Sequence, residues 1–143
     1  MIKNISADIF TTNADAIAQG CNTHGRMGAG IAKDLKDMYP LMFNDYKKRC
    51  RDGTFKPGSG YIYYNSQRPH IINLATQDRN SATEEFITSS LLWLANSYKD
   101  LNIKSVAMPK IGSGLGGIDW KIIRGIIEEN LKDTDLEVLI YHK

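Results

Sequence analysis

Two glycine-rich segments, Asn22–Lys33 (NTHGRMGAGIAK) and Pro109–Trp120 (PKIGSGLGGIDW), decide the fold of this chain. Each follows a short apolar stretch, Ala14–Cys21 or Ser105–Pro109, and each leads into a segment with helical spacing of apolar residues. Glycine lets backbone N–H groups approach a ligand with no Cβ in the way. A helix that starts just after such a loop adds unpaired N–H donors and the positive end of its dipole. We therefore expect the two loops to hold the two phosphates of one nucleotide diphosphate.

The rest of the chain alternates between apolar strands and amphipathic helices. Strands are expected at residues 2–7, 14–21, 60–65, 70–75, 105–109 and 136–141. Helices are expected at 31–38, 41–51, 81–99 and 120–131, the third opened by a capping box at 81–84 and the last capped by Asp119. This alternation favours a three-layer α/β/α sandwich around a mixed, mostly parallel sheet. Ligands of such sheets bind beyond the carboxyl ends of the strands, where both glycine-rich loops lie.

Length and composition predict one domain over residues 1–143. The net charge of +2 is too small for nonspecific binding to a nucleic acid or a membrane surface, so neither is an expected partner. Cys21 and Cys50 form no CxxC pair and no cluster with metal-ligand spacing, which predicts two reduced thiols and no metal. The chain has neither a signal-like apolar segment nor a stretch of about 20 apolar residues, so we expect a cytoplasmic protein.

Neither glycine-rich loop matches a common nucleotide motif. Gly25–Gly30 and Gly112–Gly117 fit the first six positions of a P-loop, but the Lys-Ser/Thr that must follow is replaced by Ile-Ala and Ile-Asp. Lys33 stands where a dinucleotide fingerprint needs its third glycine. Nucleoside triphosphate hydrolysis and dinucleotide redox chemistry are therefore not expected, and no cofactor is. The alternative is that the glycines serve only tight turns, which does not explain two similar loops at equivalent places in the sheet.

Four short motifs follow one another along nearly the whole chain: Ala7–Phe10, Cys21–Ala32, Ile72–Gln77 and Met108–Leu115. In this order they resemble the macrodomain family, an ADP-ribose-binding fold. The resemblance is strongest to the compact branch that contains ADP-ribose glycohydrolases and ADP-ribose-1″-phosphate phosphatases. It implies that the ligand is ADP-ribose, ADP-ribose-1″-phosphate or an ADP-ribosylated macromolecule.

The resemblance also implies roles for single residues. Asp8 would accept a hydrogen bond from the exocyclic amine of adenine beside the N–H of Ile9, unless it only caps a turn. Asn22 would hold the distal ribose, or else form an Asx-turn after its strand. Tyr141 would flank the adenine, or be an edge-strand aromatic. The other expected ligand contacts lie in the two loops and at the end of strand 70–75: Gly28, Ala29, Gly30, Ile31, Thr76, Ile111, Gly112, Ser113, Gly114, Leu115 and Gly116.

The sequence departs from this branch at two reactive positions. Thr76 is followed by Gln77 where the branch has a nucleophilic lysine, and Gly116 stands where it has an aspartate. A covalent lysine mechanism is therefore not expected. We predict instead a hydrolase that needs no metal and acts at the distal ribose, with ADP-ribose-1″-phosphate as the leading substrate.

Three residues are candidates for that chemistry. Asn22 would orient the ribose hydroxyls. His24 would act as general acid or base, because an ordinary histidine titrates near pH 6.5, unless it is an exposed loop residue. Asp119 would orient a water, unless it only caps its helix. Two further functions stay open: removal of ADP-ribose from proteins, DNA or O-acetyl esters, and non-catalytic recognition of ADP-ribose.

Overall fold

A computed structural model describes residues 1–78, 81–112 and 117–142. Within these residues, one sheet has the strand order β1-β6-β5-β2-β4-β3. Every neighbouring pair is parallel except β3 and β4, which confirms the expected mixed, mostly parallel sheet. The strands are β1 (Ile2–Ile5), β2 (Ala16–Gly20), β3 (Gly60–Tyr63), β4 (His70–Leu74), β5 (Ser105–Met108) and β6 (Glu137–Tyr141).

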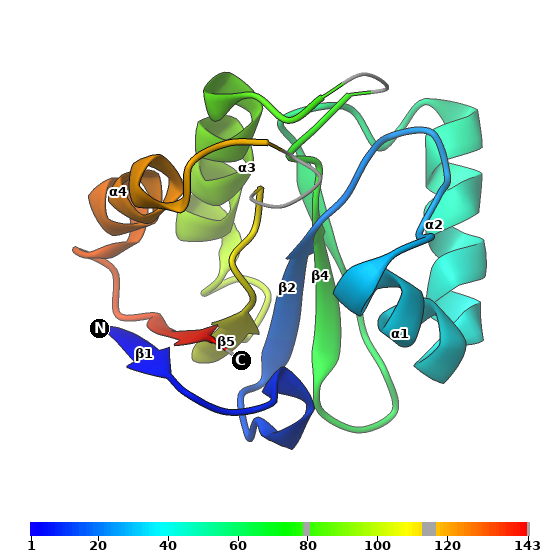
Figure 1. Cartoon of the computed structure of the whole chain (residues 1–143). Coiled ribbons are helices and arrows are strands. Elements are labelled where there is room, and N and C mark those ends of the chain that lie inside the picture. Colours follow the sequence, from blue (N-terminus) through cyan, green and yellow to red (C-terminus); the bar gives the residue numbers. More distant parts are fainter. Residues whose placement is uncertain (79–80, 113–116, 143) are drawn as a thin grey trace.

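Helices cover both faces of the sheet, which confirms the three-layer α/β/α sandwich (Figure 1). On one face lie α1 (Gly30–Met38) and α2 (Pro40–Asp52), which are separated only by Tyr39. On the other face lie α3 (Glu84–Ser97) and α4 (Trp120–Leu131). A short 3₁₀ helix, η1 (Ile9–Thr11), lies between β1 and β2.

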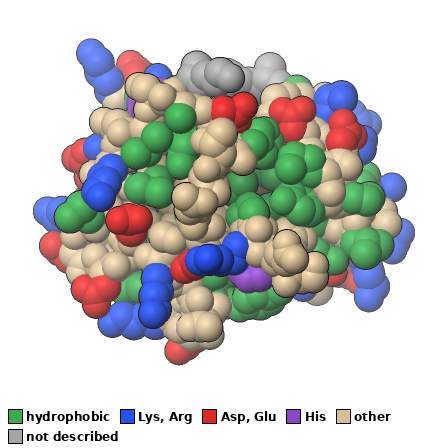
Figure 2. Space-filling model, turned by 90° about the horizontal axis from the view of Figure 1, so that it is seen from below, with side chains coloured by type: hydrophobic (Ala, Val, Ile, Leu, Met, Phe, Trp, Pro, Cys, Tyr) green, Lys and Arg blue, Asp and Glu red, His purple; other side chains and the backbone are tan. Residues whose placement is uncertain are grey.

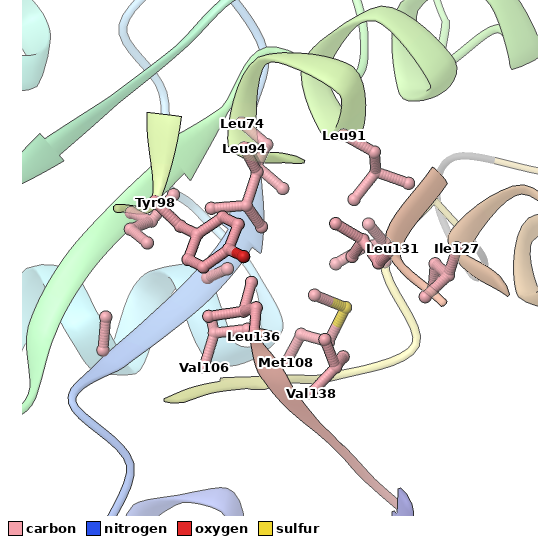
Figure 3. Close-up of a cluster of buried hydrophobic side chains, with 14 of the residues drawn as sticks. Leu74, Leu91, Leu94, Tyr98, Val106, Met108, Ile127, Leu131, Leu136 and Val138 are labelled. Carbon is pink, nitrogen blue, oxygen red and sulfur yellow. The ribbon is translucent and has the colours of Figure 1, made fainter. Parts of the chain in front are cut away.

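Alternate residues of the strands point into two hydrophobic cores, one on each face, as the period of two along a strand requires. On β2, Ala16 belongs to the core under α3 and α4, and Ile17 to the core under α1 and α2. Figure 3 shows the first of these cores, where Leu91 of α3 and Leu131 of α4 face Met108 of β5. Full burial of one such side chain contributes about 1.5–3 kcal/mol. The two cores fix the sheet between the helices and so hold the ends of β2 and β5 in place.

The start of α3 differs from the expectation. Thr83 is the N-cap, and its Oγ1 accepts a hydrogen bond from the N–H of Phe86 at 3.0 Å. The N–H of Ser81 instead donates to the Asp78 carboxylate at 3.0 Å, because Ser81 belongs to the preceding turn. The predicted capping box at Ser81 was therefore wrong by two residues.

The surface and the thiols agree with the composition. On the face shown in Figure 2, acidic and basic side chains are interspersed around a middle where hydrophobic side chains gather, as the small net charge leads one to expect. Cys21 is buried and Cys50 half-buried, and both are free cysteines in the structure. In the described part of the chain, no helix combines the length and apolar character that crossing a membrane requires.

Candidate functional site

The two glycine-rich loops meet because the strands that precede them are neighbours. β2 and β5 pair in parallel, so their carboxyl ends lie side by side. Two hollows, of about 990 Å³ and about 370 Å³, open beside these ends. Gly30, Ile31, Pro109 and Lys110 line both hollows, which therefore form one crevice. The structure thus brings the first loop and the start of the second into a shared cleft.

The first loop presents the amino end of α1 to this crevice. Gly30 begins the helix with φ +59°, and Gly30, Ile31 and Ala32 all line the smaller hollow, as do Gly28 and Ala29. The N-cap, Ala29, provides no side-chain acceptor, and the first turn carries no acidic residue. N–H groups in the first turn of a helix have no intrahelical acceptor and stand at the positive end of its dipole. This arrangement suits an anionic oxygen.

The second loop is described only up to Gly112 and again from Gly117. Ile111 and Gly112 line the smaller hollow. Gly112 has φ +75°, and a Cβ there would lie 2.8 Å from Ile87 Cδ1 and 2.9 Å from Ile123 Cδ1. Glycine is therefore required both for the backbone conformation and for the close approach to the core. The predicted contacts Ser113, Gly114, Leu115 and Gly116 lie outside the described residues.

The floor of the smaller hollow is formed where β2 and β4 end. Thr76 is 2% exposed and lines the hollow together with Gly20 and Cys21. Burial, and then the nearby Cys50, raises the pKa of the Cys21 thiol far above its ordinary value. Cys21 therefore stays a protonated thiol rather than a nucleophile.

Asn22 lies just beyond the carboxyl end of β2 and lines the smaller hollow. Its Oδ1 accepts hydrogen bonds from the N–H of His24 at 3.1 Å and of Arg26 at 3.4 Å, and its Nδ2 donates to the Arg26 carbonyl at 2.8 Å. Tyr46 of α2 donates to the same Oδ1 at 2.6 Å. Asn22 therefore closes an Asx-type turn and also faces the hollow, so the turn and the ligand contact are compatible.

Asp8, Ile9 and Tyr141 come together in the larger hollow, although they lie at opposite ends of the chain. The parallel pairing of β1 with β6 brings the carboxyl ends of the first and last strands to the same edge of the crevice. Asp8 Oδ1 accepts from the N–H of Phe10 at 3.0 Å and so caps η1. A carboxylate has two oxygens and about four acceptor sites, so capping η1 and accepting from a ligand are compatible roles for Asp8.

Two of the three residues suggested for chemistry lie away from the crevice. His24 lines neither hollow, and its Nδ1 atom is buried. Asp119 is exposed and caps α4, accepting from the N–H of Lys121 at 2.9 Å. The geometry thus supports the capping alternative for Asp119, and it brings neither His24 nor Asp119 to the hollows.

Sequence reasoning missed several residues that line the larger hollow, among them Phe10, Asp34, Met38, Lys110 and His142. Lys110 follows Pro109 in the motif Met108–Leu115, and that position was the one signal that pointed to it. His142 is brought in by β6. Partial burial, then Lys110 and Arg124, lowers its pKa, and its ring meets that of Trp120 edge to face at 6.3 Å.

The chain was compared with known proteins. The family model "Macro domain" matches residues 18–127. A DNA ADP-ribosyl glycohydrolase of Mycobacterium tuberculosis is 33% identical over 99% of this chain and 42% of its own length. An ADP-ribose 1″-phosphate phosphatase of Candida albicans is 31% identical over 90% of this chain and 93% of its own length. This chain thus spans less than half the length of the DNA ADP-ribosyl glycohydrolases it matches.

Solved structures agree with these matches. The macrodomain of Mycobacterium tuberculosis DarG superposes with a TM-score of 0.93 at 32% identity, over 100% of this chain and 98% of that one. Thermosipho africanus DarTG in complex with ADP-ribose superposes with a TM-score of 0.91 at 26% identity, over 98% of this chain and 41% of that one.

Proposed function

The chain belongs to the Macro domain family, and on that premise we propose that it binds ADP-ribose in the crevice and hydrolyses a bond at the distal ribose. The observation that carries the proposal is the shared cleft, in which the amino end of α1 and the start of the second loop face each other across the ends of β2 and β5. Relatives that hydrolyse ADP-ribose derivatives support the reaction class.

The proposed ligand runs along the crevice from one hollow to the other. The adenine lies in the larger hollow with its amine on the Asp8 carboxylate and Tyr141 at its flank. The diphosphate lies over Gly30 and Ile31, which both hollows share. The distal ribose lies in the smaller hollow, near Asn22 and Thr76. Hydrogen bonds to a charged oxygen contribute about 1.5–3 kcal/mol each, so a few of them account for micromolar affinity, about −8 kcal/mol.

ADP-ribose-1″-phosphate is the leading substrate. Water replaces the phosphate on the distal ribose, and the cleft supplies catalysis mainly by holding that ribose in one orientation. Gln77 lines the smaller hollow where a lysine nucleophile would be needed for a covalent route, so direct attack by water is favoured. The roles of His24 and Asp119 as general acid–base and water-orienting residues stay predictions without support from the geometry.

Phosphate release tests the reaction. We expect the wild-type protein to release phosphate from ADP-ribose-1″-phosphate and Asn22→Ala to lose most of this activity. His24→Ala should retain activity if the histidine stays outside the cleft. A wild-type protein that releases no phosphate, at enzyme concentrations up to that of the substrate, would refute this substrate.

Asp8→Asn tests the binding mode separately. Asparagine keeps one oxygen that can cap η1. Its NH₂ group then stands where Asp8 offers its second oxygen, so the adenine amine meets a donor in place of an acceptor. We expect calorimetry to show ADP-ribose affinity weakened by about 1–3 kcal/mol, the scale of one buried unsatisfied polar group. Asp100→Asn, an exposed substitution after α3, is the matched control. Equal affinities for all three proteins would remove Asp8 from the binding site.

DNA carrying ADP-ribose is the second candidate substrate. It is favoured by the 33% identity to a DNA ADP-ribosyl glycohydrolase of Mycobacterium tuberculosis, of which this chain covers 42%. Release of ADP-ribose from ADP-ribosylated DNA, assayed beside ADP-ribose-1″-phosphate with the same protein preparation, separates the two. Stabilisation by ADP-ribose in a thermal shift with turnover of neither substrate would identify a non-catalytic reader.

A further inference from the structure

A buried tyrosine hydroxyl lies against both the side chain and the backbone of Asn22. The Oη of Tyr46 lies 2.6 Å from Asn22 Oδ1, 2.9 Å from the Asn22 carbonyl and 3.4 Å from the Arg26 carbonyl. All three neighbours are acceptors, so the single O–H of the tyrosine is the donor of this cluster. The shortest of the distances assigns that hydrogen to Oδ1. Tyr46 therefore holds the side-chain amide of Asn22 from the side of α2.

The orientation of the amide follows from its donors. Besides Tyr46, the N–H groups of His24 and Arg26 point at Oδ1. If the amide were turned over, its NH₂ group would face three donors, and its oxygen would face the Arg26 carbonyl. The orientation is thus fixed by backbone groups of known polarity. An oxygen that already accepts three hydrogen bonds has no capacity left for a substrate hydroxyl or for a water.

What Asn22 can offer a ligand is therefore a donor. One N–H of Nδ2 is bonded to the Arg26 carbonyl at 2.8 Å, and the other is the group available to the hollow that Asn22 lines. We propose that Tyr46 is a positioning residue that keeps Asn22 as a pure hydrogen-bond donor to an oxygen of the distal ribose. The proposal rests on the proposed function for the identity of that ribose, but not for the arrangement of the two side chains.

Tyr46 is well suited to hold a fixed position. It is fully buried, and its ring packs edge to face on Phe55 with the centroids 5.8 Å apart, while Phe43 lies 6.2 Å away. Burial raises the pKa of its hydroxyl well above the ordinary range, and the neighbouring thiols of Cys21 and Cys50 act in the same direction. The hydroxyl therefore keeps its hydrogen at neutral pH and can act as a donor.

The chain provides a matched control in Tyr61. It is 8% exposed, it packs edge to face on the other side of Phe55 at 5.3 Å, and burial also raises its pKa. Its hydroxyl accepts a hydrogen bond from Asn73 Nδ2 at 2.9 Å, inside the core, and so serves a different amide from that of Asn22. Tyr61→Phe thus removes a buried hydroxyl from the same aromatic cluster and leaves the amide of Asn22 untouched.

Three measurements on the intact protein test the proposal. In ligand-free protein, the NMR signals of the Asn22 side-chain NH₂ should move in Tyr46→Phe and stay in place in Tyr61→Phe. In steady-state kinetics, Tyr46→Phe should lower kcat about tenfold or more with KM changed less than about threefold, whereas Tyr61→Phe should stay within about twofold in both. In an Asn22→Ala background, Tyr46→Phe should have no further effect on kcat, because the group it positions is gone.

Different results would refute the positioning role of Tyr46 and the proposed hydrolysis. Loss of activity in Asn22→Ala, together with wild-type signals and kinetics in Tyr46→Phe, would overturn the positioning role and leave the proposed function intact. Equal effects of Tyr46→Phe and Tyr61→Phe on the Asn22 NMR signals and on the kinetics would also overturn the positioning role. The Tyr46 hydroxyl would then act only through the overall stability of the protein. A wild-type protein that turns over no ADP-ribose derivative refutes the proposed hydrolysis. In that case the ligand-free NMR comparison still decides whether Tyr46 holds Asn22.

Discussion

Gly20→Ala is the sharpest test of how the floor of the crevice is built. Gly20 is the last residue of β2, and a Cβ placed on it would lie 2.6 Å from Thr76 Oγ1 and 3.4 Å from Thr76 Cγ2. The backbone of Gly20 is outside the left-handed region, so alanine is compatible with its conformation and only the contact matters. Thr76 is 2% exposed, and its short β-branched side chain is stiff at χ1, so it yields little to a new neighbour. Overpacking of this kind costs about 1–3 kcal/mol.

The double variant isolates this contact. Replacing Thr76 by alanine removes Oγ1 and Cγ2 and leaves the two Cβ atoms 3.5 Å apart, an ordinary van der Waals distance. Gly20→Ala should therefore cost about 1–3 kcal/mol in wild-type protein and less than about 0.5 kcal/mol in the Thr76→Ala background. Urea unfolding measures both, with the stability change taken from the midpoint at constant m. Wild-type stability of the single variant, or strict additivity in the double variant, would show that the strand end does not touch Thr76.

Three further changes test other parts of the structure. Thr83→Ala should cost about 0.5–2 kcal/mol in urea unfolding, because it removes the N-cap of α3, whereas Ser81→Ala should cost less than about 0.5 kcal/mol; the reverse order would restore the predicted capping box. Burial raises the pKa of Asp15, but hydrogen bonds from backbone and arginine groups outweigh it and hold the pKa below 3.8. The stability that Asp15 contributes is therefore present above that pH and lost as the pH falls through the folded-state value, so Asp15→Asn should flatten the acid limb of a stability–pH curve, and an unchanged limb would contradict the assignment. Lys110→Gln should weaken ADP-ribose binding by about two- to fivefold at low salt and by less at about 0.5 M salt, while Lys33→Gln, an exposed position paired with its own helix, should have no effect; equal effects would mean that only net charge matters.

The fold was predictable because each element carries its own signal. The boundaries of α4 were correct to the residue, since Asp119 caps the helix and Leu131 ends its apolar face. The face of α3 was less predictable. The structure buries Ile87, Leu91 and Leu94 on this helix and leaves Phe86 and Trp93 half-buried at the margin of the core.

The marginal position of Trp93 has a physical reason in the sheet. A Cβ on Gly60 would lie 2.5 Å from Trp93 Cε3, so the indole covers the start of β3, where only a glycine leaves room. A period of 3.6 identifies an apolar stripe along a helix, but it does not say which edge of that stripe meets a neighbouring strand. That choice depends on a residue more than 30 positions away in the chain, which no local pattern contains.

The glycine-rich loops of the crevice were predictable from the sequence, but the other residues that line it were not. Glycine spacing and the preceding strands located Gly28–Ile31 and Gly112, because a loop at a strand end is a local property. Lys110 and His142 reach the site because β5 pairs with β6. No local sequence pattern around either residue indicates that pairing. Sheet order is decided by which strands bury the most apolar surface together, and sequence periodicity alone leaves several orders open.

Asn22 shows why a structural and a functional interpretation of one residue need not compete. An Asx-turn satisfies the carbonyl oxygen of the side chain with backbone N–H groups of the same loop, and here Tyr46 adds a third donor. The more completely that oxygen is satisfied, the more narrowly the NH₂ group is aimed, because the planar amide turns as one unit. The turn is thus the means by which a flexible glycine-rich loop presents a rigid donor. Asn22→Asp separates the two effects: aspartate keeps the oxygen that closes the turn but has no N–H, so turnover should fall as far as in Asn22→Ala. Because its second oxygen faces the Arg26 carbonyl that Nδ2 now bonds, stability should also fall, by about 1–3 kcal/mol, with the protein still folded. Activity retained by the aspartate variant would mean that the turn, and not the donor, is what the site requires.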